Sequence, residues 1–172
     1  LRDLVGDDAI ACVGHAYRLD LDLVRVDAVE FTRLVRRAEA ASSPQERWQL
    51  SHDALSLWHG EAFGELAGQE PFDLEAHRLD ELRCAAMEIN LAADLELGHH
   101  ELAVGELQCF VHEHPYREHM WRLLVEALIR SDRRVEALRA CAQWRDLLTE
   151  AGVAPSETLI ELEQRALASH DR

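Results

Sequence analysis

The sequence predicts an all-α fold: a tetratricopeptide-like array of about seven helices in hairpins, preceded by a short β-hairpin. Composition favours helix, because 48% of the 172 residues are apolar, only 6% are aromatic, and Leu, Ala, Glu and Arg abound. Turn residues are scarce, and 8 glycines and 4 prolines are fewer than a sheet protein of this length normally needs. A helix–turn–helix pattern also recurs after 34 residues, the period of tetratricopeptide repeats.

The first 25 residues differ from the rest of the chain. The stretches AIACV (9–13) and AYRLDL (16–21) predict two short strands, with Gly14 and His15 at the turn between them. The residues before them predict the end of a helix that Gly6 closes. Because an isolated hairpin is marginally stable in water, we expect a larger domain upstream.

From Val26 onward the pattern is helical. The first expected helix, about 27–41, has apolar residues at the spacing of a helix with one buried face. Ser43 is expected to cap the second, with Pro44 in its first position and Glu46 completing a capping box. This helix is expected to end at a loop, 60–70, that holds three of the eight glycines.

Five more helices are expected, with short links between them. Pro115 should end one helix, and Gly152 is expected to form the C-terminal cap of a later one. Pro155 or Ser156 opens the last helix. The expected spans are 71–97, 100–114, 116–130, 133–151 and 156–169.

The 34-residue repeat has a physical reason at each matched position. Aligning Gly98 with Asp132, both at helix–helix turns, also aligns Ala103 with Ala137. A small residue is needed where the two helices of a hairpin cross closely, and these alanines supply it. Two other pairs of apolar residues lie 34 residues apart in the same alignment: Met87 with Trp121, and Leu107 with Cys141. A third unit is expected at 27–58, because such arrays bury their core only by stacking neighbours.

Charge limits the partners. The formal net charge of −15 should repel phosphate, so this chain alone is expected to bind DNA weakly or not at all. The acidic surface would suit a basic partner; the alternative is a role in solubility alone. The four cysteines lie singly in apolar surroundings and the apolar runs are short, which favours a cytoplasmic protein with reduced thiols and no membrane span.

No catalytic or metal-binding pattern appears in the sequence. There is no GxGxxG, GxxxxGK[ST] or HExxH motif, and no arrangement typical of a nucleophile with its base. The ten histidines are scattered; His112 and His114, for example, would point to different faces of a helix. We therefore expect no enzyme activity, no metal site and no cofactor.

The four tryptophans each fall within a helical apolar stripe, which favours core packing. Partner anchoring is the alternative. Trp144 is the best candidate for that role.

An ordered series of segments resembles a known family, the bacterial transcriptional activator domain of antibiotic-regulatory-protein type regulators. The resemblance covers about 26–169 and implies a domain at 26–172. The matching segments are VDAVEF (26–31), ALSLWHGEAF (54–63), RLDELR (78–83), LELGHHELAVGEL (95–107), HPYREHMWRLLVEALIRSDRRVEAL (114–138) and LLTEAGVAPSETLIELEQRAL (147–167).

Residues 1–25 resemble the end of the OmpR-type winged helix-turn-helix that precedes this domain in the family. The match is carried by Gly14, Tyr17, Arg18 and Leu19, although Ala16 stands where the family usually has glycine. The resemblance implies that promoter DNA is read by the upstream winged helix. In the intact protein, His15 and Arg18 would then touch the DNA backbone; the alternative is a packing role in which Tyr17 and Leu19 dock the wing onto the first helix.

The concave face of a tetratricopeptide array is formed by the first helix of each hairpin, and repeat position predicts which residues line it. Arg122 and Arg130 would share a face and could hold carboxylates of a partner peptide, or they could only pair with Glu126. The predicted partner groove is Glu88, Ala92, His119, Arg122, Glu126 and Arg130, with Ala85, Leu95, Glu96 and Ile129 beside it.

The resemblance implies a regulatory domain of a DNA-binding transcriptional activator. It would support homodimerisation, which places two DNA-binding heads on paired half-sites, and would contact RNA polymerase or another protein partner through the groove. One alternative is a peptide-binding adaptor unrelated to transcription, which would have no use for the N-terminal hairpin. Another is a sensor that closes on a small molecule in the groove.

Overall fold

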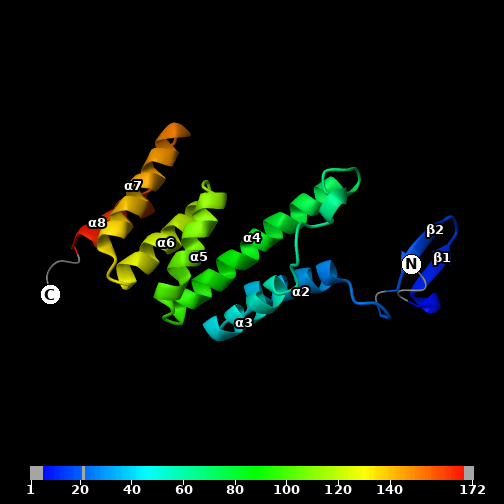
Figure 1. Ribbon diagram of the computed structural model, residues 1–172. Helices are drawn as coiled ribbons and strands as arrows, with labels where there is room; N and C mark the ends of the chain where they lie inside the picture. The colour runs from blue at the N-terminus through cyan, green and yellow to red at the C-terminus, as the bar shows by residue number, and fades with distance from the viewer. Residues whose placement is uncertain (1–5, 21, 169–172) are drawn as a thin grey trace.

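The computed structural model describes residues 6–20 and 22–168 of the chain. Within them lie seven α-helices and a two-stranded sheet, which confirms the predicted fold class (Figure 1). The strands are β1 (Ile10–Val13) and β2 (Ala16–Leu19). The α-helices are α2 (Asp27–Ala40), α3 (Pro44–Leu55), α4 (Phe72–Glu96), α5 (His100–Glu113), α6 (Glu118–Arg130), α7 (Arg134–Glu150) and α8 (Glu157–Ala168). Short 3-10 turns occupy Asp7–Ala9 and Gly64–Leu66.

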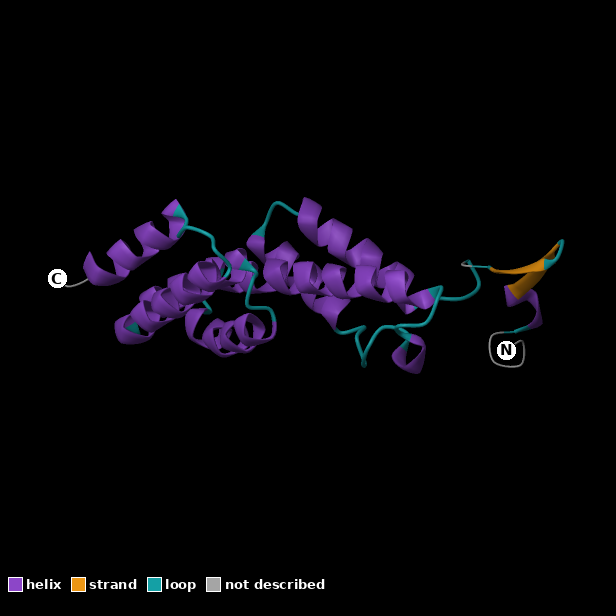
Figure 2. Ribbon diagram, turned by 90° about the horizontal axis from the view of Figure 1, so that it is seen from above, coloured by secondary structure: helices purple, strands orange, loops and turns teal. Residues whose placement is uncertain are grey.

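The N-terminal hairpin has the predicted position. Its strands pair antiparallel from Ile10 opposite Leu19 to Val13 opposite Ala16, and Gly14 takes a φ of 65° in the turn. The hairpin stands beyond the N-terminal end of α2, apart from the helical array (Figures 1 and 2). Tyr17 is 75% exposed and Leu19 37%, so the expectation that they dock the hairpin onto the first helix is wrong. The predicted helix end before Gly6 lies outside the described residues.

The helices form a two-layer array of antiparallel hairpins. Each helix packs against the next in sequence, and α2–α4, α4–α6 and α6–α8 are also in contact. This alternation places α2, α4, α6 and α8 in one layer and α3, α5 and α7 in the other. α8 covers the C-terminal end of the stack (Figure 1).

The long helix α4 joins two hydrophobic cores. Leu79 and Ala86 pack in an N-terminal core with α2 and α3, around Phe31. Leu91 and Leu95 pack in a larger C-terminal core with α5 to α8. α4 is apolar on more than one face, as expected of a helix that contacts neighbours on two sides.

The two 34-residue units match at the level of backbone hydrogen bonds. At the first turn, Gly98 N–H donates to Leu95 O (3.2 Å) and His99 N–H to Asp94 O (2.9 Å). At the second turn, the N–H groups of Asp132 and Arg133 donate to Ile129 O (3.1 Å) and Leu128 O (2.8 Å) in the same pattern. This is the bonding of a helix end that closes through a left-handed residue.

The equivalent alanines also occupy equivalent sites. Ala103 is 1% exposed at the start of α5 and Ala137 0% at the start of α7, and both belong to the C-terminal core. The predicted burial of both alanines at equivalent positions is therefore confirmed.

Several helix boundaries follow from the capping groups that the sequence indicated. The Ser43 hydroxyl accepts a hydrogen bond from Glu46 N–H at 3.1 Å, as predicted. α3 ends at Leu55, earlier than expected, and a turn at residues 56–57 and an irregular stretch at 58–59 follow it. This segment places Trp58 edge-on against Phe31, with ring centroids 5.4 Å apart.

Replacing Asp132 with glycine is expected to raise the free energy of unfolding by about 0.5–1 kcal/mol. Asp132 holds a φ of 57°, a left-handed conformation that glycine adopts without strain, and the equivalent residue in the preceding unit is glycine. Urea denaturation measures the change. The reverse substitution, Gly98→Asp, has open space around the new Cβ and should cost a similar amount. A neutral D132G variant would contradict the equivalence of the two turns.

Candidate partner-binding groove

A groove of about 520 Å³ opens in the layer formed by α2, α4 and α6. α4 and α6 supply most of its wall, because their contact places one side of each helix along the same channel. Arg47 reaches in from α3. The lining residues are Ala38, Glu39, Arg47, Ala85, Glu88, Ile89, Ala92, Glu96, His119 and Arg122.

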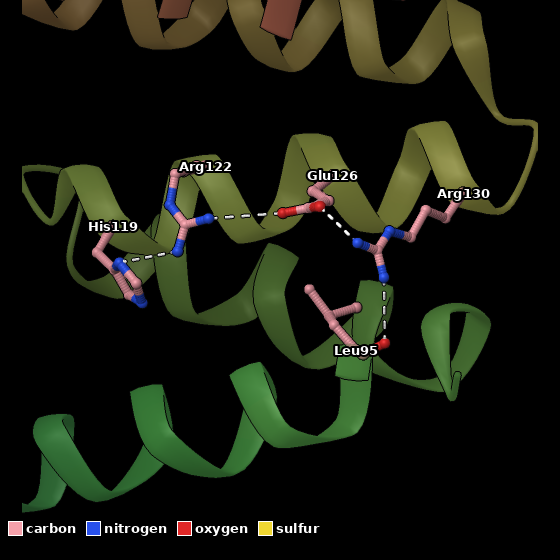
Figure 3. A network of polar contacts seen from close by, with 5 residues as sticks. All are labelled: Leu95, His119, Arg122, Glu126 and Arg130. Atoms are coloured by element: carbon pink, nitrogen blue, oxygen red, sulfur yellow. Dashed lines mark hydrogen bonds and ion pairs between the residues drawn. The ribbon is translucent and has the colours of Figure 1, made fainter. Parts of the chain in front are cut away.

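Four of the six predicted groove residues lie together in this channel. Glu88 and Ala92, one helical turn apart, come from α4, and His119 and Arg122 come from α6. The other two, Glu126 and Arg130, continue along the same side of α6, as Figure 3 shows. The structure thus brings the predicted set onto one surface; whether a partner binds there stays a prediction.

Glu126 joins the two arginines of α6. Its Oε1 lies 2.7 Å from Arg130 Nη2 and its Oε2 3.5 Å from Arg122 Nη1. Arg130 also donates to the backbone oxygen of Leu95 at 3.4 Å, which connects α6 to the end of α4 (Figure 3). The predicted pairing with Glu126 is therefore present. A carboxylate of a partner would then bind arginines that Glu126 already orients.

Three further ion pairs order the walls of the groove. Arg117, just before α6, contacts Glu88 at 3.1 Å and Glu81 at 2.5 Å. Its hydrogen bond lowers the pKa of the Glu81 carboxyl. Arg47 of α3 contacts Glu96 of α4 at 2.5 Å. Charges of both signs thus lie along the channel, and most are paired within the chain.

His119 contributes a titratable acceptor to this surface. Its Nδ1 lies 3.2 Å from Arg122 Nη2. Arginine has only donors, so Nδ1 must accept and the ring must be neutral, with its proton on Nε2. Desolvation, and then the positive charge of Arg122, lower the pKa of His119, and the carboxylate of Glu88 opposes this shift.

The variant His119→Gln is expected to lose less stability than the wild type as the pH falls below about 6.5. The pKa of His119 is lower in the folded chain, so the unfolded chain binds the proton first. The contribution of neutral His119 to stability is therefore complete above the pKa of the unfolded chain, and it is lost as the pH falls through the pKa of the folded chain. Thermal melts at several pH values measure the effect. His15→Gln, on the hairpin, is the control; an unchanged pH profile for H119Q would contradict the assignment.

One residue expected beside the groove is not on its surface. Leu95 is 4% exposed and packs in the C-terminal core, so only its backbone oxygen takes part in the network. Ile129 is half-buried, and its place beside the groove stays a prediction. The prediction extended the exposed face of α4 too far, to a side chain that packs in the core. Arg47 and Glu39, from the first hairpin, were missed because no repeat register places them.

Trp144 is not a partner anchor. It is 1% exposed in the C-terminal core, so the alternative that named it as the best anchoring candidate is wrong. Trp121 is also buried and donates from Nε1 to Pro115 O at 2.8 Å. Trp58 is half-buried, with the Arg83 guanidinium 4.8 Å from its ring centroid.

The hairpin carries the two residues expected to touch DNA. His15 lies in its turn and Arg18 on β2, and both are exposed. They share no surface with the groove. A DNA contact through them stays a prediction.

The potential metal ligands of the described part of the chain are dispersed. Within 6–20 and 22–168, no three His, Cys, Asp or Glu side chains are grouped as metal ligands would be. Burial raises the pKa of Cys141 to about 11, so this thiol is protonated and unreactive at neutral pH. Among these same residues, no helix has the length and apolar character that crossing a bilayer requires.

Comparison with known proteins identifies the family. The sequence profile of the bacterial transcriptional activator domain (BTAD) matches residues 26–167. Regulatory protein AfsR of Streptomyces griseus is 37% identical over 176 residues, covering 99% of this chain and 18% of AfsR. Regulatory protein DnrI of Streptomyces peucetius is 34% identical over 163 residues, covering 91% of this chain and 58% of DnrI.

A solved structure has the same architecture. Mycobacterium tuberculosis EmbR, in complex with a low-affinity phosphopeptide, aligns with a TM-score of 0.80 at 27% identity, covering 99% of this chain and 48% of that one. The chain thus spans less than two thirds of the length of each of these regulatory proteins. The match over residues 26–167, together with the helical array, shows that the chain belongs to the bacterial transcriptional activator domain family.

Proposed function

We propose that the chain is the regulatory and interaction domain of a DNA-binding transcriptional activator, which dimerises and presents its groove to RNA polymerase. Membership of the BTAD family supports a role in transcription over an adaptor unrelated to it. The observation that carries the proposal is the groove between α2, α4 and α6, where predicted residues from two repeat units meet. Its action would be cytoplasmic and would need neither a cofactor nor catalysis.

Residues 1–25 would be the C-terminal remnant of a winged helix, and 26–172 the activator domain. Support comes from the hairpin at β1 and β2, which lies before the matched family region. Promoter recognition would then belong to the upstream winged helix. His15 and Arg18 would touch the DNA backbone in the intact protein.

The groove suits an extended or helical peptide that carries charges of both signs. Glu88 and Glu96 offer carboxylates, and Arg122 offers guanidinium donors beside His119. EmbR, one of the structural relatives, was solved with a phosphopeptide, which supports a protein segment as the class of partner. Binding would exchange internal ion pairs for pairs with the partner, so specificity rather than high affinity is expected.

The test measures the affinity of RNA polymerase holoenzyme for the chain in a groove variant, E88Q/R122Q. The control E75Q/R78Q removes one acid and one base in the same way, from an exposed pair 2.7 Å apart on α4. The groove variant should bind polymerase at least about tenfold more weakly, and the control should match the wild type within about twofold. Equal affinity for all three proteins would overturn the proposed polymerase contact.

Dimerisation is tested separately by sedimentation at several concentrations. The proposal predicts a mass that rises toward twice the 19.6 kDa of the chain. A constant monomer mass over the whole range would remove dimerisation from the proposal. The alternative of a small-molecule sensor predicts a thermal shift with a metabolite, and a flat response to a broad panel would count against it.

A further inference from the structure

The outward face of α2 is a basic surface on an otherwise acidic chain. A shallow hollow of about 520 Å³ runs along it, lined by Val29, Thr32, Arg33, Arg36, Arg37 and Ala40. These residues recur at three- and four-residue intervals and so lie along one side of the helix. No acidic residue lines the hollow, although the whole chain has a net charge of −15.

The arginines of this face, defined here as the α2 arginine face (Arg33, Arg36 and Arg37), differ in their availability to a partner. Arg36 and Arg37 are exposed, and neither makes an ion pair or side-chain hydrogen bond within residues 6–20 and 22–168. Arg33 is held by Glu30 through contacts of 2.9 and 2.5 Å. Most other arginines of the described chain are paired, as at Arg117, Arg130 and Arg145.

The face lies on the first helix of the array, which follows the hairpin in the chain, and it runs from the middle of that helix to its last turn. α2 is the first helix of the stack, and the hairpin that carries His15 and Arg18 extends beyond its N-terminal end (Figures 1 and 2). Arg25, exposed in the connection between them, adds another cation. Glu39 of the same helix points elsewhere, because it lines the groove with α4.

We infer that the α2 arginine face binds the phosphate backbone of duplex DNA that flanks the site contacted by the hairpin, and that this local positive charge outweighs the net charge from which weak or no DNA binding was expected. The inference rests on the proposed function of the chain as part of a DNA-binding regulator. Arg33 and Arg37 are one helical turn apart, about 6 Å, a separation that reaches neighbouring phosphates of one strand. Guanidinium groups bind phosphate with two parallel hydrogen bonds, and this contact needs no base recognition.

The charge pattern favours a nucleic acid over a second copy of the chain as occupant. In a symmetric contact between two α2 helices, the arginines of one copy would meet those of the other. A two-fold contact in which the face of each copy meets an acidic patch of the other would close, and the self-association measurement below distinguishes it. DNA offers the face a continuous row of negative charge.

The test uses the 172-residue chain and a fluorescein-labelled duplex of random sequence, about 24 base pairs long, in anisotropy titrations at low salt. The variant R33Q/R36Q/R37Q should bind at least about tenfold more weakly than the wild type. The slope of log K against log salt should fall by about 2.7, which is 0.9 for each lost phosphate contact. Circular dichroism confirms that each variant is folded.

Two matched variants keep the result specific. R78Q/R133Q/R139Q removes the exposed Arg78 of α4 and Arg139 of α7 and the half-buried Arg133 just before α7, and it should bind the duplex as the wild type does. R33K/R36K/R37K keeps the charge and should retain the salt slope. The chain has no lysine, because all 18 of its Lys and Arg residues are arginine. The single variant R36K therefore introduces the first side-chain amine of the chain. Bound duplex should protect this amine from acylation.

Three outcomes would overturn the inference. One is a wild type that does not bind the duplex at low salt. Another is an equal loss of binding in the α4/α7 triple variant, which would mean a response to net charge alone. The third is unchanged duplex binding in R33Q/R36Q/R37Q with altered self-association, which would assign the face to a second copy. Polymerase binding through the groove is measured in a separate experiment. A failure of the proposed function can therefore be distinguished from a failure of the inferred DNA contact.

Discussion

Replacing Trp144 with alanine is expected to lower the free energy of unfolding by about 3–5 kcal/mol. Trp144 is 1% exposed and is among the largest fully buried side chains of the described chain. It lies in the core shared by α4 to α8, so its removal leaves a cavity that several helices would have to fill. Urea denaturation followed by circular dichroism measures the loss.

Tyr116→Ala is the matched control for an aromatic side chain. Tyr116 is 76% exposed, and its removal should change stability by less than about 0.5 kcal/mol. If W144A were as stable as Y116A, the result would contradict the burial of Trp144 in the C-terminal core. Under conditions in which W144A is folded, its affinity for polymerase should match that of the wild type, because the ring is not on the surface.

Enlarging either repeat alanine is expected to destabilise the chain by about 1–3 kcal/mol for each substitution to leucine. Ala103 and Ala137 are 1% and 0% exposed at the start of the second helix of their hairpins. Three added carbon atoms must separate the crossing helices or force strained rotamers. Chemical denaturation of A103L, A137L and the double variant measures the losses separately and together.

Ala142→Leu supplies the control, because Ala142 lies on the exposed side of the same helix as Ala137. It should leave stability nearly unchanged, since leucine and alanine both favour helix. The two repeat positions should give similar losses because their turns have the same hydrogen bonds. A large loss at one site and none at the other would contradict the equivalence of the two units.

Most of the fold could be predicted because its signals are local. Ser43 and Glu46 form a cap that depends only on neighbouring residues, and Gly98 and Asp132 mark turns at a fixed interval. The repeat then determines which helices are neighbours. For this reason the helix order, the buried alanines and four of the groove residues could be predicted from the sequence.

The rest of the site depends on contacts between distant segments. Arg47 meets Glu96 across 49 residues, and no periodic pattern indicates that α3 reaches the groove. The expected exposure of Leu95 failed for a related reason, since α4 is apolar on more than one side and the sequence does not say which neighbour covers each side. The end of α3 was missed because the segment after Leu55 places Trp58 against Phe31, a contact that follows from packing.

The most direct test of the account is hydrogen–deuterium exchange of the chain with and without RNA polymerase holoenzyme. The account predicts slower amide exchange on complex formation in the stretches of α4 and α6 that form the groove, 85–96 and 119–130. It predicts little change in α5 and α7, which form the opposite layer. Protection confined to α5 and α7, or no protection with saturating polymerase, would contradict the claim that the groove is the surface through which this domain acts.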